Sequence, residues 1–235
     1  MKPRILAIDT TTEFGSLALV LDGALVEEVP MHSAEGFGHV VFSQVEALLA
    51  RHSWKPAEID CFAAAAGPGS FTGVRVCVAA VKGLGEALGK PVVAVSNLQA
   101  AAWHGSAPLR AVVLDARREE VYGAVYTASL ELALPEIVAK FPAWLAILPE
   151  GELEFLSTDL DLFRHALEGT RFAGAPLREV PRALAGAVGR IAAARFAAGL
   201  AMSPAAIDAN YVRRSDAELL WRDFQKDVPA AGRGS

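Results

Sequence analysis

The sequence is short of cysteine and has no long hydrophobic run. Its two cysteines, Cys61 and Cys77, form no C-x-x-C pair, so we expect two buried thiols rather than a disulfide framework or a zinc site. No stretch reaches the roughly 18 uninterrupted apolar residues of a membrane span. The apolar run that begins at Ile5 is broken at Asp9, which argues against a signal peptide. These features predict a soluble cytoplasmic protein without a membrane partner.

An excess of basic residues is also missing. The 235 residues include 22 lysines and arginines against 27 aspartates and glutamates, for a net charge of −5. A protein that binds tRNA unaided usually carries a basic surface. The composition therefore argues against autonomous RNA binding, and it permits a subunit that helps another protein to bind RNA. Apolar residues make up 53% of the chain, which is typical of a globular protein with a substantial core.

The hydrophobic pattern predicts strands and helices in mixed order along the chain. An Asp22-Gly23 pair is a strong hairpin signal between two apolar runs. In the first half we expect strands at residues 5–8, 16–21, 24–29, 59–66 and 91–95, and helices at residues 37–52, 74–88 and 97–104. In the second half we expect strands at residues 111–115 and 121–126, strand-like runs at 136–148 and 154–156, and helices at 161–167 and 182–200.

The two halves share a pattern. An apolar strand that ends in aspartate occurs at Ile5 to Asp9 and again at Ala111 to Asp115, and each is followed by a second apolar run. This self-similarity predicts a duplicated βββαβα unit. We therefore expect an α/β fold with two lobes, of the actin, hexokinase and Hsp70 (ASKHA) kind, with a degenerate second lobe. The expected division is an N-terminal lobe at 1–106, a C-terminal lobe at 107–228 and a disordered tail at 229–235.

A glycine-rich turn joins a predicted strand to a predicted helix. Three glycines in seven residues suit a tight turn in which the backbone approaches something closely, and Ser70 and Thr72 are each suited to cap the helix. The spacing fits neither a dinucleotide fingerprint nor a Walker loop. A purely structural turn is the alternative interpretation. The turn consists of Gly67, Pro68, Gly69, Ser70, Phe71, Thr72 and Gly73.

The stretch GPGSFTGVR resembles the signature of the bacterial tRNA threonylcarbamoyladenosine biosynthesis protein TsaB (YeaZ) family. Two further segments support the resemblance. Asp115 to Tyr122 is similar to the family's DAR-x-x-EVY motif, with Glu119 where the family usually has a small residue. Residues 209–213 resemble its Pro-x-Tyr-Leu-Arg, with Ala209 in place of the proline.

The resemblance implies a non-catalytic scaffold or activator in the synthesis of threonylcarbamoyladenosine beside the anticodon of tRNAs that read ANN codons. It implies pairing with the transferase TsaD, recruitment of the ATPase TsaE, indirect contact with tRNA, and a homodimer when TsaD is absent. ATP and metal would then belong to the partner subunits, and no cofactor is expected in the isolated chain.

Catalytic residues are sparse in the sequence. TsaD resembles this family and uses an H-x-x-x-H pair as metal ligands, but no two of the five histidines here stand four apart. Asp9 could face a phosphate, as in actin-like ATPases, or simply cap its own turn. The alternative function is an actin-like kinase or ATPase with Asp9 and Asp115 as its acidic residues. The candidates for a vestigial nucleotide loop are Asp9, Thr10, Thr11, Asp115, Arg117, Arg118 and Glu120.

Two predicted helices are candidates for a partner surface. The helix at 74–88 is apolar around more of its circumference than one sheet can cover, and exposed apolar area of that kind marks protein interfaces. Together with the helix at 37–52 it is predicted to contact TsaD or a second copy of the chain. The predicted interface residues are Val40, Ser43, Gln44, Val74, Arg75, Val78, Val81 and Lys82.

Overall fold

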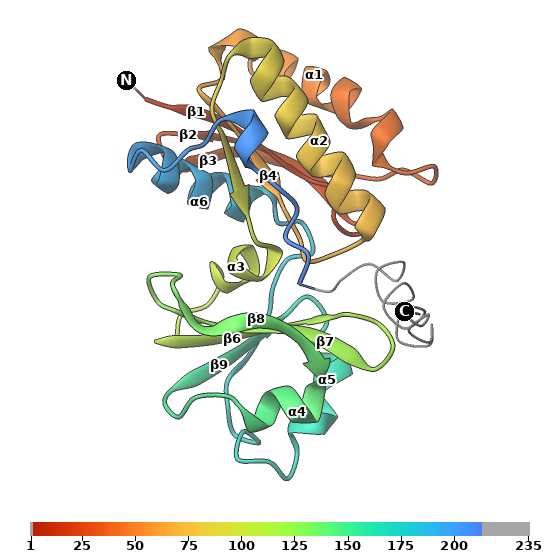
Figure 1. Cartoon of the computed structure of the whole chain (residues 1–235), viewed down its shortest axis with the longest axis vertical. Helices are drawn as coiled ribbons and strands as arrows, with labels where there is room; N and C mark the ends of the chain where they lie inside the picture. Colours follow the sequence, from red (N-terminus) through yellow and green to blue (C-terminus); the bar gives the residue numbers. More distant parts are fainter. Residues whose placement is uncertain (1, 213–235) are drawn as a thin grey trace, which may run out of the picture.

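Two five-stranded sheets, each with helices packed on it, form two lobes that are stacked along the long axis of the molecule (Figure 1). The computed structural model describes residues 2–212. Both termini of this described part lie with the first lobe or at its boundary with the second. Arg213 and the tail expected at 229–235 lie outside the described residues.

The first sheet has the strand order β3-β2-β1-β4-β5. Its first three strands form an antiparallel meander, and Asp22 and Gly23 both have the positive φ angles that a two-residue hairpin turn requires. The last two strands run parallel to β1. The strands are β1 (Arg4–Asp9), β2 (Gly15–Leu21), β3 (Ala24–Met31), β4 (Cys61–Ala65) and β5 (Val92–Val95).

The second sheet repeats this topology strand for strand. Its order is β8-β7-β6-β9-β10, with an antiparallel meander followed by two parallel strands. The predicted duplication and the two-lobed α/β fold class are therefore confirmed. The strands are β6 (Leu109–Asp115), β7 (Glu120–Thr127), β8 (Leu132–Lys140), β9 (Leu153–Ser157) and β10 (Leu177–Glu179).

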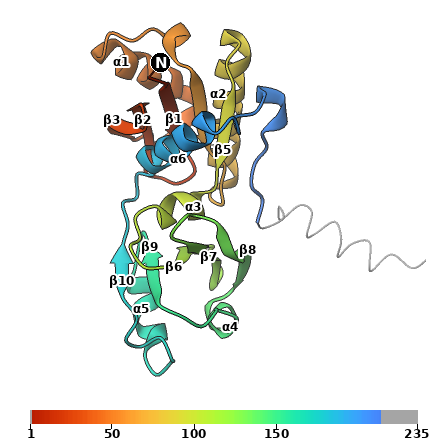
Figure 2. The ribbon, with the colours of Figure 1, turned by 90° about the vertical axis from the view of Figure 1, so that its left-hand side faces the viewer.

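Helices cover the first sheet on both faces (Figures 1 and 2). On one face lie α1 (Val41–Arg51) and α2 (Phe71–Leu88), and on the other lies α6 (Ala185–Ala197). The apolar face predicted for the first helix is buried, but the α-helix begins at Val41 after a short 3-10 helix, Phe37–His39. Ser70 caps α2, because its Oγ accepts a hydrogen bond from the backbone N–H of Gly73.

The second sheet carries shorter helices, as expected for a degenerate copy. They are α4 (Phe141–Ala146), α5 (Asp161–Leu167) and α3 (Asn97–Ala102), which packs against β6, β7 and β9. The strand-like run predicted at 136–148 is wrong in its second part. Pro142 stands near the start of α4 and the helix buries Trp144 completely, so residues 141–146 are helical.

The lobes exchange helices relative to the sequence. The helix α3 follows the last strand of the first sheet but packs on the second, and α6 follows the last strand of the second sheet but packs on the first. The C-terminal lobe expected at 107–228 is therefore too long, because residues 184–207 contribute to the first core.

Both cysteines are buried and free. Within residues 2–212 no helix is long and apolar enough to cross a membrane.

Candidate functional site

A cavity of about 370 Å³ lies between the two lobes. It is built by segments that follow the parallel strands of both sheets, and the crevice beyond the carboxyl ends of parallel strands is where ligands bind in open α/β sheets. Residues at the end of β6, and in the segments just after β1, β4, β5, β6, β9 and β10, line this cavity. The polar and charged lining residues are Thr11, Thr12, Glu13, Ser70, Asn97, Asp115, Arg117, Thr158, Asp159 and Arg182.

The loop after β1 is not an open phosphate loop. Its residues Asp9, Thr10 and Thr11 form a buried polar cluster, which we call the Asp9 knot. Asp9 is 0% exposed, and its Oδ1 accepts hydrogen bonds from the backbone N–H of Thr11, at 2.9 Å, and from its hydroxyl, at 2.6 Å. Thr10 donates its hydroxyl to the backbone carbonyl of Gly73 at 2.7 Å. Of the three residues, Thr11 alone lines the cavity. Asp9 therefore holds its own turn, as the capping interpretation proposed.

The glycine-rich turn closes over this knot. A Cβ at Gly69 would lie 2.5 Å from the carbonyl oxygen of Thr11, and a Cβ at Gly73 would lie 2.0 Å from that of Thr10. Both positions therefore exclude any side chain, and Ser70 donates its backbone N–H to the carbonyl of Thr11 at 2.7 Å. The close approach that the glycines predicted is to the protein's own backbone.

Asn97 ties the two lobes together at this point. It is 1% exposed and is the first residue of α3, which packs on the second sheet. Its Oδ1 accepts from the backbone N–H of Gly67 at 2.9 Å, and its Nδ2 donates to the hydroxyl of Thr11 at 2.5 Å. The knot, the glycine turn and the helix of the other lobe thus share one set of hydrogen bonds.

Burial perturbs the carboxyl of Asp9. Desolvation raises the pKa of Asp9 from 3.8 to about 6, against the lowering effect of the two hydrogen bonds from Thr11. Its Oδ2 is buried without a hydrogen-bond partner. Glu28 and the buried thiol of Cys77 are close enough for their charges to interact with it.

The loop after β6 repeats the turn made by Asp9 in the loop after β1, but its aspartate is not buried. Asp115 accepts the backbone N–H of Arg117 at 2.7 Å and is exposed. Arg117 lines the cavity, whereas Arg118 and Glu120 do not. The predicted cluster therefore sends Asp115 and Arg117 to the cleft.

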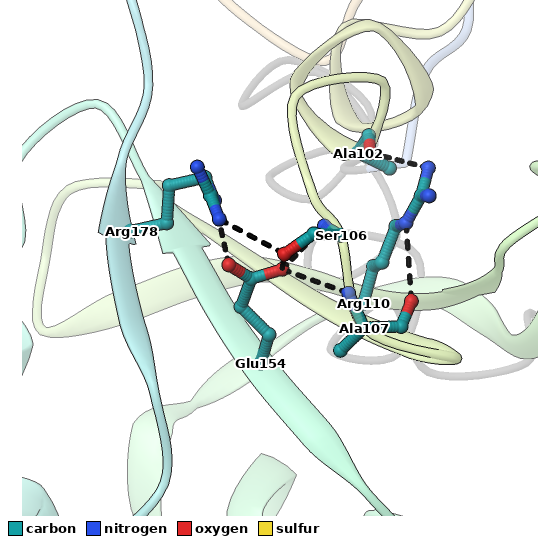
Figure 3. Close-up of polar contacts among 6 residues, drawn as sticks. All are labelled: Ala102, Ser106, Ala107, Arg110, Glu154 and Arg178. Carbon is teal, nitrogen blue, oxygen red and sulfur yellow. Dashed lines mark hydrogen bonds and ion pairs between the residues drawn. The ribbon is translucent and has the colours of Figure 1, made fainter.

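A buried carboxylate fixes the segment that follows α3 (Figure 3). Glu154 on β9 is 3% exposed and accepts from the backbone N–H groups of Ser106 and Ala107, at 2.7 and 3.2 Å. Arg178 on β10 donates to the same carboxylate at 2.6 Å. This network fixes the segment after α3 to the second sheet. Asn97, the first residue of α3, therefore connects the glycine turn of the first lobe to the second lobe.

The predicted partner surface is partly buried in the structure. Val74, Val78 and Val81 are 2%, 6% and 0% exposed and belong to the first core. The prediction that they form an exposed flank is wrong, because α2 is covered by the sheet, the 3-10 helix at Phe37–His39 and another at Pro204–Ala206. Of the other predicted interface residues, three are exposed and two are half-buried, namely Ser43, Gln44 and Arg75, and Val40 and Lys82.

The start of α2 carries an exposed aromatic cluster. Phe71 and Tyr211 are both 45% exposed, their ring centroids are 5.8 Å apart, and the guanidinium of Arg75 lies over Phe71. The preceding residue Asn210 donates its backbone N–H to Ala66 at 2.7 Å. The described part of the C-terminal motif therefore docks beside the glycine turn despite Ala209.

Sequence reasoning missed several residues of the cleft. Asn97, Thr158, Asp159 and Arg182 carry no motif, and each follows a short strand or begins a short helix. The repeated strand pattern was the one signal that could have located them, because in a duplicated sheet the segments after equivalent strands converge.

Comparison with known proteins agrees with the motifs. The family model "TsaD: tRNA N6-adenosine threonylcarbamoyltransferase" matches residues 28–175. The chain is 30% identical over 234 residues to the tRNA threonylcarbamoyladenosine biosynthesis protein TsaB of Bacillus subtilis, which covers 94% of this chain and 99% of that protein. The chain belongs to the TsaB (YeaZ) family. The Escherichia coli protein of the same name is 35% identical over 127 residues, 52% of this chain and 54% of that protein.

Solved structures of the family have the same fold. YeaZ from Pseudomonas aeruginosa superimposes with a TM-score of 0.75 at 26% identity, covering 89% of this chain and 99% of that one. The two-lobed arrangement found here is therefore that of the family.

Proposed function

We propose that this chain is an accessory subunit in the synthesis of threonylcarbamoyladenosine in tRNA. The observation that carries the proposal is the similarity over nearly the whole chain to a protein named for that pathway. The match of residues 28–175 to a transferase model supports the same pathway. In this role the chain pairs with a TsaD-type transferase in the cytoplasm, and the pair recruits a TsaE-type ATPase.

The state of Asp9 supports a non-catalytic role. A catalytic aspartate must reach substrate, metal or water, whereas Asp9 is buried beneath the glycine turn and does not line the cleft. ATP and metal would then be held by the partner subunits, and no cofactor is needed in this chain.

The exposed face of the α1–α2 pair is the partner surface in this proposal. It presents Ser43 and Gln44 on α1 and Arg75 on α2. Phe42, which precedes Ser43 in α1, is 53% exposed, and Gly83 further along α2 has open space where a side chain would project. An exposed aromatic side chain among small and polar residues is typical of an interface that another helix can approach closely. The same face would serve a homodimer when the transferase is absent.

Reconstitution with purified partners tests the proposal. TsaD and TsaE, tRNA and a source of threonylcarbamoyl-AMP should form modified nucleoside, measured by mass spectrometry of the digested tRNA, only when this chain is added. Ser43→Arg should abolish co-purification with TsaD and the activity together. Asp161→Arg, at an exposed position of α5 in the other lobe, is the matched control and should change neither. Full activity of Ser43→Arg would refute the surface, and product without this chain would refute the role.

Two binding experiments separate this role from an actin-like kinase or ATPase. In the first, the isolated chain is titrated with ATP and Mg²⁺ by isothermal calorimetry and is then assayed for ATP hydrolysis. The hydrolysis assay should show no turnover. Binding of tRNA by the isolated chain should be weak and salt-sensitive, because the net charge is −5. Turnover abolished by Asp9→Ala would favour the kinase or ATPase alternative instead.

A further inference from the structure

The turn between β6 and β7 has an unusual backbone. Three consecutive residues, Arg117, Arg118 and Glu119, have φ angles of 64°, 55° and 62°. This left-handed region is disfavoured for residues with a Cβ, and glycine or asparagine is the usual choice there. None of the three is either one.

Such strain is informative because another sequence could form this turn with less backbone strain. A tight hairpin connection can be made with glycine or asparagine at the left-handed positions, and strained positions of this kind cluster at functional sites. At least one side chain at this turn therefore contributes something that glycine would not. Glu119 makes one ion pair with Lys140 at 3.7 Å, with both side chains largely exposed, and such pairs add little stability.

Arg117 is the member of the three that reaches the cleft. Its side chain is 83% exposed, and its ion pair with Asp115 has a separation of 4.0 Å. Bidentate pairs between guanidinium and carboxylate are much shorter, at roughly 2.7–2.9 Å. The hydrogen-bonding fork of Arg117 is thus held beside the cavity and is not consumed by its neighbour.

A second arginine lines the same cavity from the chain crossing between the lobes. Arg182 lies over the ring of Phe14 at 4.6 Å and has Asp159 at 3.7 Å. Stacking on the ring orients the guanidinium while leaving its donors available.

We propose that the cleft binds a small molecule through an oxyanion, a phosphate or a carboxylate, which Arg117 and Arg182 hold. The hydroxyls of Thr12, Ser70 and Thr158 supply further donors. The carboxylates of Glu13, Asp115 and Asp159 also line the cavity, so the rest of the ligand is neutral or carries a positive group. The volume of about 370 Å³ suits a metabolite rather than a polymer. This inference goes beyond the accessory role and does not depend on it.

Adjacent glycine substitutions test it, because strain and binding should respond in opposite directions. Arg117→Gly relieves one left-handed residue and should raise the melting temperature of the ligand-free chain by ~2 °C, and Arg118→Gly, at the neighbouring left-handed position, is the matched control for binding. Orthophosphate, threonine and AMP are the probes, each titrated into the wild-type chain by isothermal calorimetry and by thermal shift. At least one should bind and raise the melting temperature.

The expected result is that Arg117→Gly weakens this binding at least ~10-fold, while Arg118→Gly, whose side chain is not part of the cavity lining, binds like wild type. Arg182→Gln should weaken binding of the same probe. Binding of orthophosphate and AMP would identify the anion as a phosphate, and binding of threonine alone would identify a carboxylate. The proposal is overturned if no probe binds, if Arg117→Gly binds like wild type, or if that variant melts at a lower temperature.

Discussion

Replacing Asp9 by asparagine should make the protein more stable near neutral pH. The folded-state pKa of about 6 exceeds the ordinary value of 3.8, because burial disfavours the charged carboxylate. The folded protein therefore binds this proton more tightly than the unfolded chain does. The resulting stability is complete below pH 3.8 and is lost as the pH rises through 6. The loss amounts to about 3 kcal/mol, at ~1.4 kcal/mol per pH unit.

Asparagine keeps the useful half of the side chain and never ionises. Its Oδ1 can accept the two hydrogen bonds from Thr11, while its NH2 group would replace the unpartnered Oδ2 of Asp9. An unsatisfied buried donor costs about 1–3 kcal/mol. At pH 8 the net gain in the free energy of unfolding should therefore be at most about 2 kcal/mol, and near pH 4 the variant should be less stable than wild type.

Urea unfolding of the wild type and the variant at several pH values measures this difference directly. Roughly 1.4 kcal/mol of it should develop between pH 5 and 8, and the comparison cancels groups that both proteins share. Asp161→Asn, at a carboxylate that is 93% exposed, is the control and should give a flat difference. A flat difference for Asp9→Asn as well would refute the reasoning, because it would mean that burial does not perturb this carboxyl.

Three further predictions follow from the packing and the buried hydrogen bonds. Gly73→Ala should prevent stable folding, because its Cβ would lie 2.0 Å from the Thr10 carbonyl oxygen. Gly83→Ala in the same helix is the control: its Cβ would meet nothing within 4 Å, and the free energy of unfolding should rise by about 0.5–1 kcal/mol. Equal urea midpoints for the two variants would contradict this prediction. Val78→Asp should unfold the first lobe by circular dichroism, since the side chain is only 6% exposed; a folded variant would show that the valine is not core. Glu154→Gln should cost about 1.5–3 kcal/mol at pH 7, and less in acid. Burial opposes ionisation of Glu154, but its donors lower the pKa below 4.5, so its stability is present above that pH and fades below it; thermal melts that fail to converge in acid would argue against this role.

The topology could be predicted because the duplication is written in local pattern. The apolar strand ending in Asp9 and its counterpart ending in Asp115 marked equivalent positions in two sheets of identical order. The exchange of α3 and α6 between lobes could not be predicted. Both helices are apolar on the side that packs, and nothing in periodicity says which of two sheets a helix will cover.

The parts of the site that carry sequence motifs were predicted. The residues that only the folding of separate segments brings together were missed. The glycine turn and the loop after Asp9 were located correctly, and the hydrogen bonds of Asp9 agree with the capping interpretation, but only the structure shows that Gly69 and Gly73 are pressed against the first loop. The partner valines were misplaced for a related reason. A wide apolar surface on a helix predicts burial, but it does not distinguish a partner from two 3-10 helices of the same chain, one of them 120 residues or more away in sequence.

The glycines of the turn and the arginines of the cleft therefore have different roles. The glycines at 69 and 73 leave room for the backbone of the first loop and not for a side chain, so their part in the signature is to let α2 start directly above the Asp9 knot. That contact seals Asp9 away from the cavity and places Asn97 as the hydrogen-bonded link to the second lobe. The two arginines that line the cleft come from elsewhere. Arg117 is held in the strained turn between β6 and β7, and Arg182, in the segment after β10, is stacked on Phe14.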